Sequence, residues 1–274
     1  MAGDIDTGTT DLLASLDDGV LTLTLNRPEA RNAMSGAMTT ALGQQLASAE
    51  LDGAVKCIVL TGAGKGFCAG GDVKGMAARG DGTVGDNTID AAIHRQRVNQ
   101  RATAGKLFAM PKPTIAALPG AAAGAGLSLA LACDLRIMAS TAILTTAFAR
   151  VGFSGDYGGT YFLTQLVGSA KAREMYFLSD RVSAQEALQL GLTNWVCEPD
   201  ELADKTREIA LRLASGPTVA YRYMKENLNR AMTGDMNDCL DLEATHHVHC
   251  GQTEDHREAT KAFVAKREPV FRGR

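Results

Sequence analysis

Two turns rich in glycine and alanine contain the residue types in this 274-residue chain that could do chemistry. The first, Gly66-Phe-Cys-Ala-Gly-Gly-Asp72, follows an apolar, strand-like run, and the second runs from Gly120 into an apolar helical segment that ends near Asp134. Small side chains let another molecule approach the backbone closely. The first N–H groups of a helix are free and lie at the positive end of its dipole. Two such turns in one domain predict a pair of backbone donors for an oxyanion or a phosphate.

The strands and helices that must hold these turns are predicted from hydrophobic periodicity. Alternating or short apolar runs predict strands near 12–16, 20–25, 55–61, 114–118, 134–139 and 142–146. Apolar residues three or four positions apart predict helices at 36–49, 89–109, 125–132, 159–178, 183–190, 200–214, 217–232, 236–250 and 254–267. This order predicts an α/β fold of irregular ββα units instead of regular βαβ alternation. We therefore expect a flexible tail at 1–10, a core domain at 11–200 and a C-terminal helical region at 201–274.

Composition narrows the class of protein further. Hydrophobic residues make up 45% of the chain and charged residues 22%, which is typical of an ordinary globular domain. The net charge of −3 gives no electrostatic support for nucleic-acid binding. The chain has no apolar run of ~18 residues and no apolar signal segment at its acidic N-terminus, so we expect a cytoplasmic protein that does not enter a membrane.

Cysteine and histidine give no metal pattern. The six cysteines show no CxxC spacing and are expected to be reduced, small apolar residues. His246, His249 and Cys250 share one face of a predicted helix, but no partner ligands accompany them. We therefore expect a solvated helix face there and no metal site.

Several motifs, in a fixed order over nearly the whole chain, resemble those of the crotonase (enoyl-CoA hydratase/isomerase) superfamily. The matching segments are Asn26-Arg-Pro-Glu-Ala-Arg-Asn-Ala33, Leu60-Thr-Gly62, Phe67-Cys-Ala-Gly-Gly-Asp-Val-Lys74, Pro111-Lys-Pro113, Gly120 to Asp134, Gly158-Gly-Thr160 and Ala187-Leu-Gln-Leu-Gly-Leu192. The resemblance implies a crotonase-like spiral of ββα units with a C-terminal helical trimerisation region, assembled as homotrimers or dimers of trimers. It also implies an acyl-CoA thioester substrate that forms an enolate, with no cofactor beyond the coenzyme A that the substrate carries.

The resemblance also assigns site residues. The N–H groups of Gly71 and Ala125 would hold the thioester oxygen, and each aligned donor of this kind lowers the barrier to enolate formation by roughly 3–4 kcal/mol. The residues expected along the coenzyme A moiety are Arg27, Ala30, Arg31, Ala69, Lys74, Phe263 and Lys266. Among them, the Ala69 carbonyl would meet the adenine amino group, and Phe263 and Lys266 would approach the nucleotide end.

Two glutamates that family hydratases use are missing. Their positions, six residues before Asp134 and ten before Gly158, hold Ser128 and Phe148. Neither side chain carries a proton with a pKa near neutrality, so hydration by the usual pair is not expected. Ser128 is expected beneath the pocket, where its hydroxyl could hold a water molecule or a substrate oxygen.

Asp156 is the acid that remains close by, just ahead of Gly158-Gly-Thr160. Some isomerases of the family place an aspartate there, and one carboxylate suits allylic isomerisation because it can take a proton from one carbon and return it two carbons away. An apolar wall that contains Phe148 would raise its pKa. The alternative is an ordinary helix N-cap, because 157–167 is predicted to be helical. Tyr157 is expected either in the acyl tunnel or in the core.

These observations leave three hypotheses for function. The favoured one is double-bond isomerisation of an enoyl-CoA, with Gly71 and Ala125 holding the enolate and Asp156 moving the proton. The second is enoyl-CoA hydration, as in fatty acid β-oxidation, by groups other than the missing glutamates. The third is a non-catalytic acyl-CoA binder that has kept the fold and lost the chemistry.

Overall fold

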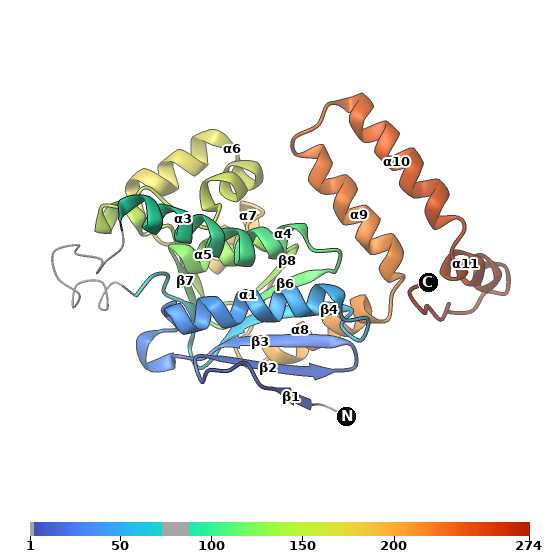
Figure 1. Ribbon diagram of the computed structural model, residues 1–274, viewed down its shortest axis with the longest axis horizontal. Helices are drawn as coiled ribbons and strands as arrows, with labels where there is room; N and C mark the ends of the chain where they lie inside the picture. The colour runs from blue at the N-terminus through green and yellow to red at the C-terminus, as the bar shows by residue number, and fades with distance from the viewer. Residues whose placement is uncertain (1–2, 73–87) are drawn as a thin grey trace.

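Two β-sheets form the centre of the molecule in the computed structural model, which describes residues 3–72 and 88–274 (Figure 1). The larger sheet has the order β1-β2-β3-β4-β6-β8-β11, and the smaller has the order β10-β9-β7-β5. The strands of the larger sheet are β1 (Gly3–Ile5), β2 (Leu12–Asp17), β3 (Val20–Leu25), β4 (Cys57–Gly62), β6 (Thr114–Leu118), β8 (Leu135–Ala139) and β11 (Trp195–Cys197). Those of the smaller sheet are β5 (Gly66–Cys68), β7 (Ala121–Ala123), β9 (Ile143–Thr145) and β10 (Val182–Ser183).

The chain alternates between the two sheets and then adds a helix, which is the predicted ββα spiral. The pairs β4 and β5, β6 and β7, and β8 and β9 each place one strand in each sheet, and within each sheet these strands run parallel. The helices are α1 (Gly36–Leu51), α3 (Ile89–Gln100), α4 (Lys106–Ala109), α5 (Ala125–Ala132), α6 (Gly159–Leu178), α7 (Ala184–Gln189), α8 (Leu202–Ala214), α9 (Thr218–Ala231), α10 (Met236–Cys250) and α11 (Glu254–Val264).

Short strands are where the structure departs from the sequence predictions. Residues 3–5, expected in a flexible tail, form β1 and pair antiparallel with β2. Strands β5 and β7 lie inside the glycine- and alanine-rich turns, which were expected to be a loop and a tight turn. A strand of three residues shows no periodicity, and alanine and glycine have low β-propensity. These strands exist because a neighbouring strand pairs with them.

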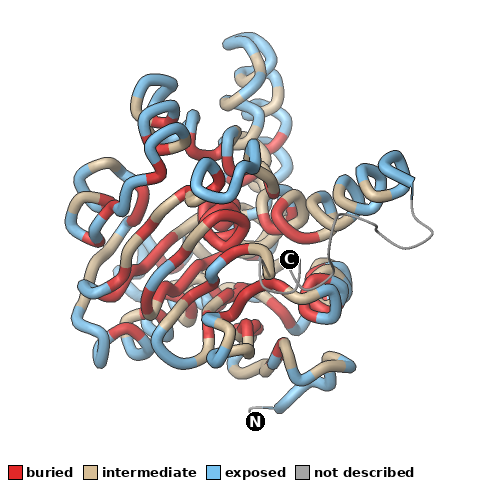
Figure 2. Tube along the Cα trace, turned by 90° about the vertical axis from the view of Figure 1, so that its left-hand side faces the viewer, coloured by how far each residue is buried: buried red, intermediate tan, exposed pale blue. Residues whose placement is uncertain are grey.

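The core lies between the sheets and the helices that cover them. Figure 2 shows the buried segments gathered in the strands and in the helices packed against them. Helix α5 is buried along all of its eight residues. Its sequence is apolar or small on every side, as expected for a helix enclosed by other elements. The start of α5, where the predicted donor Ala125 lies, is therefore held by packing on all sides.

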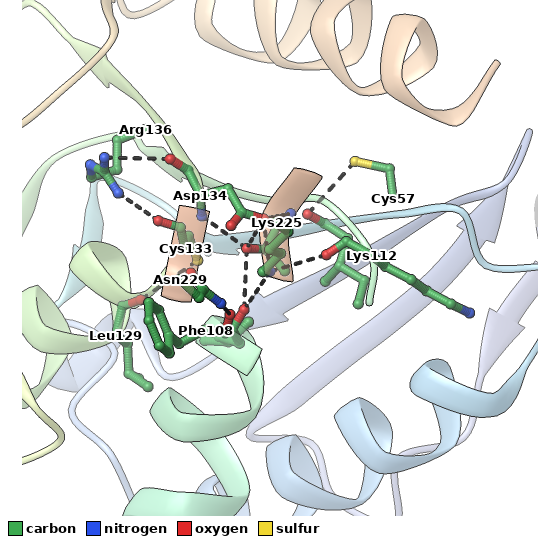
Figure 3. Close-up of polar contacts among 12 residues, drawn as sticks. Cys57, Phe108, Lys112, Leu129, Cys133, Asp134, Arg136, Lys225 and Asn229 are labelled. Carbon is green, nitrogen blue, oxygen red and sulfur yellow. Dashed lines mark hydrogen bonds and ion pairs between the residues drawn. The ribbon is translucent and has the colours of Figure 1, made fainter. Parts of the chain in front are cut away.

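The C-terminal helices α9, α10 and α11 extend away from the sheets (Figure 1) and are joined to the core through polar contacts of α9. The Lys225 ammonium donates to the Leu107 carbonyl at 2.9 Å, to the Lys112 carbonyl at 3.2 Å and to Asp134 Oδ2 at 2.9 Å (Figure 3). Asn229 Nδ2 donates to the Phe108 carbonyl at 3.0 Å. The carbonyls of the last turn of α4, which have no partner within the helix, are thus satisfied from α9.

Lys225→Met is expected to lower the free energy of unfolding by about 2 kcal/mol, because it leaves buried oxygens without their donor. Chemical denaturation followed by circular dichroism at fixed protein concentration measures the effect. Lys205→Met is the matched control: Lys205 is a partly exposed lysine on α8 that pairs with Glu208 at 2.9 Å. Its loss is expected to change stability by less than about 0.5 kcal/mol. Equal effects of the two changes would contradict a role for Lys225 in anchoring α9.

Candidate active site

The Gly70–Gly71 peptide lies against the start of α5. A Cβ added at Gly70 would lie 2.8 Å from the Ala123 carbonyl oxygen and 3.3 Å from the Ala125 amide nitrogen, and Gly70 has a φ of +89°. Only glycine fits such a close approach in this conformation. The structure therefore brings together the two turns that the sequence predicts to supply the donors.

Neither of the two predicted donor amides bonds to another described residue. The hydrogen bonds among residues 3–72 and 88–274 include none donated by the Gly71 or Ala125 N–H. The Met34 amide donates to the Gly70 carbonyl at 2.8 Å in a parallel bridge to Gly71, which directs the Gly71 N–H away from Met34. Ala125 is the first residue of α5, where a backbone N–H has no partner within the helix. Both amides are therefore available to an acceptor from outside the protein.

The turn at residues 27–33 packs beside this peptide and is organised by a side chain that sequence reasoning missed. Asn32 is fully buried; its Nδ2 donates to the carbonyls of Ala63 (3.0 Å) and Gly66 (2.8 Å), and its Oδ1 accepts the Arg27 amide (2.9 Å). The Cys68 thiol donates to the Asn32 carbonyl at 3.0 Å. Asn32 thus joins the first predicted binding turn to the glycine turn.

The residues expected along coenzyme A are only partly assembled within one chain. The Ala69 amide donates to the Arg31 carbonyl at 3.0 Å, which places Ala69 beside the turn that contains Arg31 and Ala30. Arg31 and Ala69 are exposed and Ala30 is half-buried. Arg27, in contrast, donates to Asp72 Oδ2 at 3.2 Å and lies 3.8 Å from Asp11, so its charge is already paired inside the protein.

Two of the predicted binding residues, Phe263 and Lys266, lie elsewhere. Phe263 belongs to α11, which lies in Figure 1 at the opposite side of the molecule from α3 and α6, and Lys266 follows α11 directly. Phe263 is 85% exposed, so within this chain it contacts little. Lys74 lies outside the described residues.

Asp156 lies in the segment that leads from the short helix Phe148–Val151 into α6 and does not cap α6. The helix begins at Gly159 with Gly158 as its N-cap, and no side chain bonds to that end. The N-cap alternative for Asp156 is therefore wrong, because two residues with positive φ, Tyr157 and Gly158, separate it from the first helical residue.

The Asp156 carboxyl is poorly satisfied. Its Oδ1 is fully buried and has no hydrogen-bond partner among the described residues. Desolvation by burial raises the pKa of Asp156 from 3.8 to about 6. A half-buried carboxyl with one unsatisfied oxygen and a pKa near neutrality is a candidate proton carrier, because both of its protonation states are accessible at physiological pH.

Gln100, on the last turn of α3, holds the backbone next to Asp156. Its Oε1 accepts the Tyr157 amide at 2.6 Å, and Tyr157 has a φ of +50°, which is uncommon for a residue other than glycine. Tyr157 itself is buried in the core cluster, as one of its two expected placements predicts. Gln100 was missed because nothing in its local sequence separates it from an ordinary polar helix residue.

The two positions that lack glutamate meet in space. Ser128 and Phe148 both line a narrow gap, together with Gly124, Gly159 and Tyr176 among others. The Ser128 hydroxyl donates to the Gly124 carbonyl at 3.2 Å. The two replacement residues, which are 20 positions apart in the sequence, therefore lie close together in the structure. Tyr176 was not predicted to be part of this group.

No group of three or more His, Cys, Asp or Glu side chains in residues 3–72 and 88–274 could hold a metal ion. His246 instead stacks on Tyr223 with ring centroids 4.2 Å apart. All six cysteines are free, and burial raises the pKa of Cys57, Cys68 and Cys133 to about 12. No helix in this part of the chain has both the length and the apolar character needed to cross a membrane.

The fold and this site together define a class of enzyme, and sequence comparison shows the same class. Residues 15–274 match the family described as enoyl-CoA hydratase/isomerase, and the chain belongs to that family. It is 36% identical over 263 residues to 1,2-epoxyphenylacetyl-CoA isomerase of Escherichia coli (strain K12), covering 96% of this chain and 98% of that protein. It is 35% identical over 253 residues to the short-chain-enoyl-CoA hydratase of Clostridium acetobutylicum, covering 91% and 92%. A crystal structure of enoyl-CoA hydratase from Bacillus anthracis superposes with a TM-score of 0.88 at 31% identity, covering 96% of this chain and all of that one.

The carboxyl of Asp156 is expected to destabilise the folded protein above pH 6. Its folded-state pKa of about 6 exceeds the ordinary value of 3.8, so the folded protein binds this proton more tightly than the unfolded chain does. The protonated carboxyl therefore contributes to stability. This contribution is complete below the ordinary pKa of 3.8 and is lost as the pH rises through the folded-state pKa of about 6. Asp156→Asn should therefore raise the melting temperature at pH 8 and have a much smaller effect at pH 4.

The control for this measurement is Asp200→Asn, which alters an exposed carboxyl and is expected to leave the melting temperature unchanged at both pH values. An Asp156→Asn protein that melts at or below the wild-type temperature at pH 8 would show that the carboxylate has partners that stabilise it.

Proposed function

We propose that this protein moves the double bond of an enoyl-CoA thioester through an enolate held by the amides of Gly71 and Ala125. The proposal is supported by two backbone donors without partners among the described residues and by one poorly solvated carboxyl, Asp156. Family membership supports a coenzyme A thioester as substrate, because the relatives above are named for reactions of acyl-CoA or enoyl-CoA compounds. Coenzyme A arrives as part of that substrate, and the reaction needs no further cofactor.

The proposed reaction transfers one proton within one substrate. The Asp156 carboxylate takes a proton from C2 of a 3-enoyl-CoA, and the electron pair of that C–H bond moves into the thioester carbonyl to give a dienolate. The two amides stabilise the negative oxygen, which each can do by roughly 3–4 kcal/mol in a dry site. Asp156 then returns the proton to C4, so that the double bond lies between C2 and C3 and the carboxylate is regenerated.

Hydration is the second candidate, and the name of the Clostridium relative favours it. Water addition at C3 needs a base to activate the water and an acid to protonate C2. Ser128 and Phe148 supply neither, and the gap between them is too narrow for a water molecule. Asp156 alone would have to take the proton from water and deliver it to C2, a task that the family's hydratases divide between two carboxyls. Isomerisation is therefore the activity that these side chains support best.

We also propose that copies of the chain assemble as trimers or dimers of trimers. The arm of α9, α10 and α11 leaves large apolar side chains uncovered, among them Leu228 at 68% and Phe263 at 85% exposure. Assembly would cover this surface and could bring Phe263 and Lys266 to the coenzyme A of a neighbouring copy.

The test of function follows the absorbance of the conjugated thioester in two assays. With a 3-enoyl-CoA the absorbance should rise, and with crotonyl-CoA it should not fall at a comparable rate. Asp156→Asn should lower kcat for isomerisation by at least about 100-fold, and the wild-type kcat/KM should decline below about pH 6, because the base must be ionised. A fast fall in absorbance with crotonyl-CoA would favour hydration. Tight binding of acyl-CoA without turnover of either substrate would favour the hypothesis of a non-catalytic acyl-CoA binder.

Gly70→Ala tests the donor pair separately from the base. The added Cβ would meet the Ala123 carbonyl at 2.8 Å and must shift the Gly71 amide. We expect kcat to fall by roughly 100-fold or more, as for the loss of one oxyanion donor. Gly66→Ala, four residues earlier, adds a Cβ with nothing within 4 Å and should retain most of the activity. Circular dichroism of both variants would establish that they fold. A folded Gly70→Ala protein with normal kcat would refute the proposed donor role.

A further inference from the structure

Tyr176 lies beside Ser128 and Phe148, the two residues that stand where the family's hydratases have glutamate. Its ring stacks on that of Phe148, with centroids 5.7 Å apart and planes 13° from parallel. Its hydroxyl oxygen lies 2.6 Å from the point where a Cβ at Gly159 would be, and Ser128 Oγ lies 2.3 Å from the same point. Tyr176 therefore contacts Phe148, and its hydroxyl and that of Ser128 both lie beside Gly159, although Tyr176 comes from the far half of α6, beyond the break in that helix at Gly168.

The narrow gap beside Tyr176 reaches Gly124, the residue before the proposed donor Ala125. Gly124 lines it together with the apolar side chains of Leu127, Leu131 and Leu163. The gap is so narrow that no water-sized sphere fits in it. A buried water needs both room and two to four polar partners. The aromatic pair of Tyr176 and Phe148 thus fills space that a water molecule would otherwise occupy.

Tyr176 also borders the segment that contains Asp156. A Cβ at Gly155 would lie 2.9 Å from Tyr176 Cε1 and 3.3 Å from its hydroxyl oxygen. Burial and the nearby Asp156 carboxylate raise the pKa of Tyr176, so its hydroxyl stays protonated at neutral pH and is not a base. The ring therefore separates the Asp156 segment from the Ser128 side of the site without adding a proton acceptor.

We propose that Tyr176 is a specificity-determining residue whose ring, stacked on Phe148, excludes water from the enoyl group and so restricts the enzyme to proton return instead of water addition. The inference rests on the proposed isomerase function. With the ring removed, a water molecule admitted to the gap could add its oxygen to C3 of the 2-enoyl product, while Asp156 takes one proton from that water and C2 receives it. The product would be a 3-hydroxyacyl-CoA.

The experiment measures product partition in water labelled with ¹⁸O. Wild-type protein and variants convert a 3-enoyl-CoA, and mass spectrometry counts the 2-enoyl-CoA and the labelled 3-hydroxyacyl-CoA. Tyr176→Ala should raise the ratio of hydrated to isomerised product at least tenfold. Tyr176→Phe keeps the ring and should leave the ratio within twofold of wild type. Phe177→Ala, the adjacent and largely exposed aromatic residue of α6, is the matched control and should behave like wild type.

Phe148→Ala opens the same gap from the other side and should also raise the ratio, which keeps the test valid if Tyr176→Ala fails to fold. An unchanged ratio in a folded Tyr176→Ala or Phe148→Ala protein would overturn the inference. A change in Tyr176→Phe as large as that in Tyr176→Ala would also overturn it, by assigning the effect to the hydroxyl. Wild-type protein without any isomerisation would instead refute the proposed function, so the two failures are distinguishable.

Discussion

The close contact between the backbone at Gly70 and the backbone at the start of α5 is the constraint on which the site depends. Parallel pairing of β5 with β7 brings the two glycine-rich turns side by side, and a Cβ at Gly126 would lie only 2.4 Å from the Cys68 carbonyl oxygen. Such an approach is possible only where side chains are absent. Because the donors in the proposed mechanism are main-chain atoms, the fold itself sets their direction, and side-chain rotamers do not.

Desolvation by burial gives Asp156 its raised pKa. Its Oδ1 is buried and has no hydrogen-bond partner among the described residues. The ring of Tyr176, which stacks on Phe148, packs beside Gly155 in the same segment. Burial disfavours the charged form of this carboxyl in the folded state, and in the proposed mechanism the same effect tunes its pKa for proton transfer. Gln100 holds the neighbouring peptide in an uncommon conformation, so local strain and desolvation occur at one place, as is frequent in functional sites.

The C-terminal helices are connected to the core beside the C-terminal end of α5. Asp134, two residues after the end of α5, accepts from Lys225 of α9 and from the amide and hydroxyl of Thr114 at the start of β6. The donor Ala125 lies at the other end of α5. The position of α9 and the position of α5 are therefore linked by one partly buried carboxylate. Removal of either partner would leave charge without compensation in a poorly hydrated place.

The sequence by itself determined the longer strands and helices and their order, the two glycine- and alanine-rich turns, the residues that stand at the two glutamate positions and Asp156 as the acid that remains nearby. These are local properties: periodicity reports on a few consecutive turns or strand residues, and small-residue runs show where a backbone can be approached. Only the tertiary structure decided which side chains meet. Asn32, Gln100 and Tyr176 act on residues far from them along the chain, and the three-residue strands exist through pairing alone. Contacts of this kind depend on the packing of the whole domain, and no local pattern of residues encodes them.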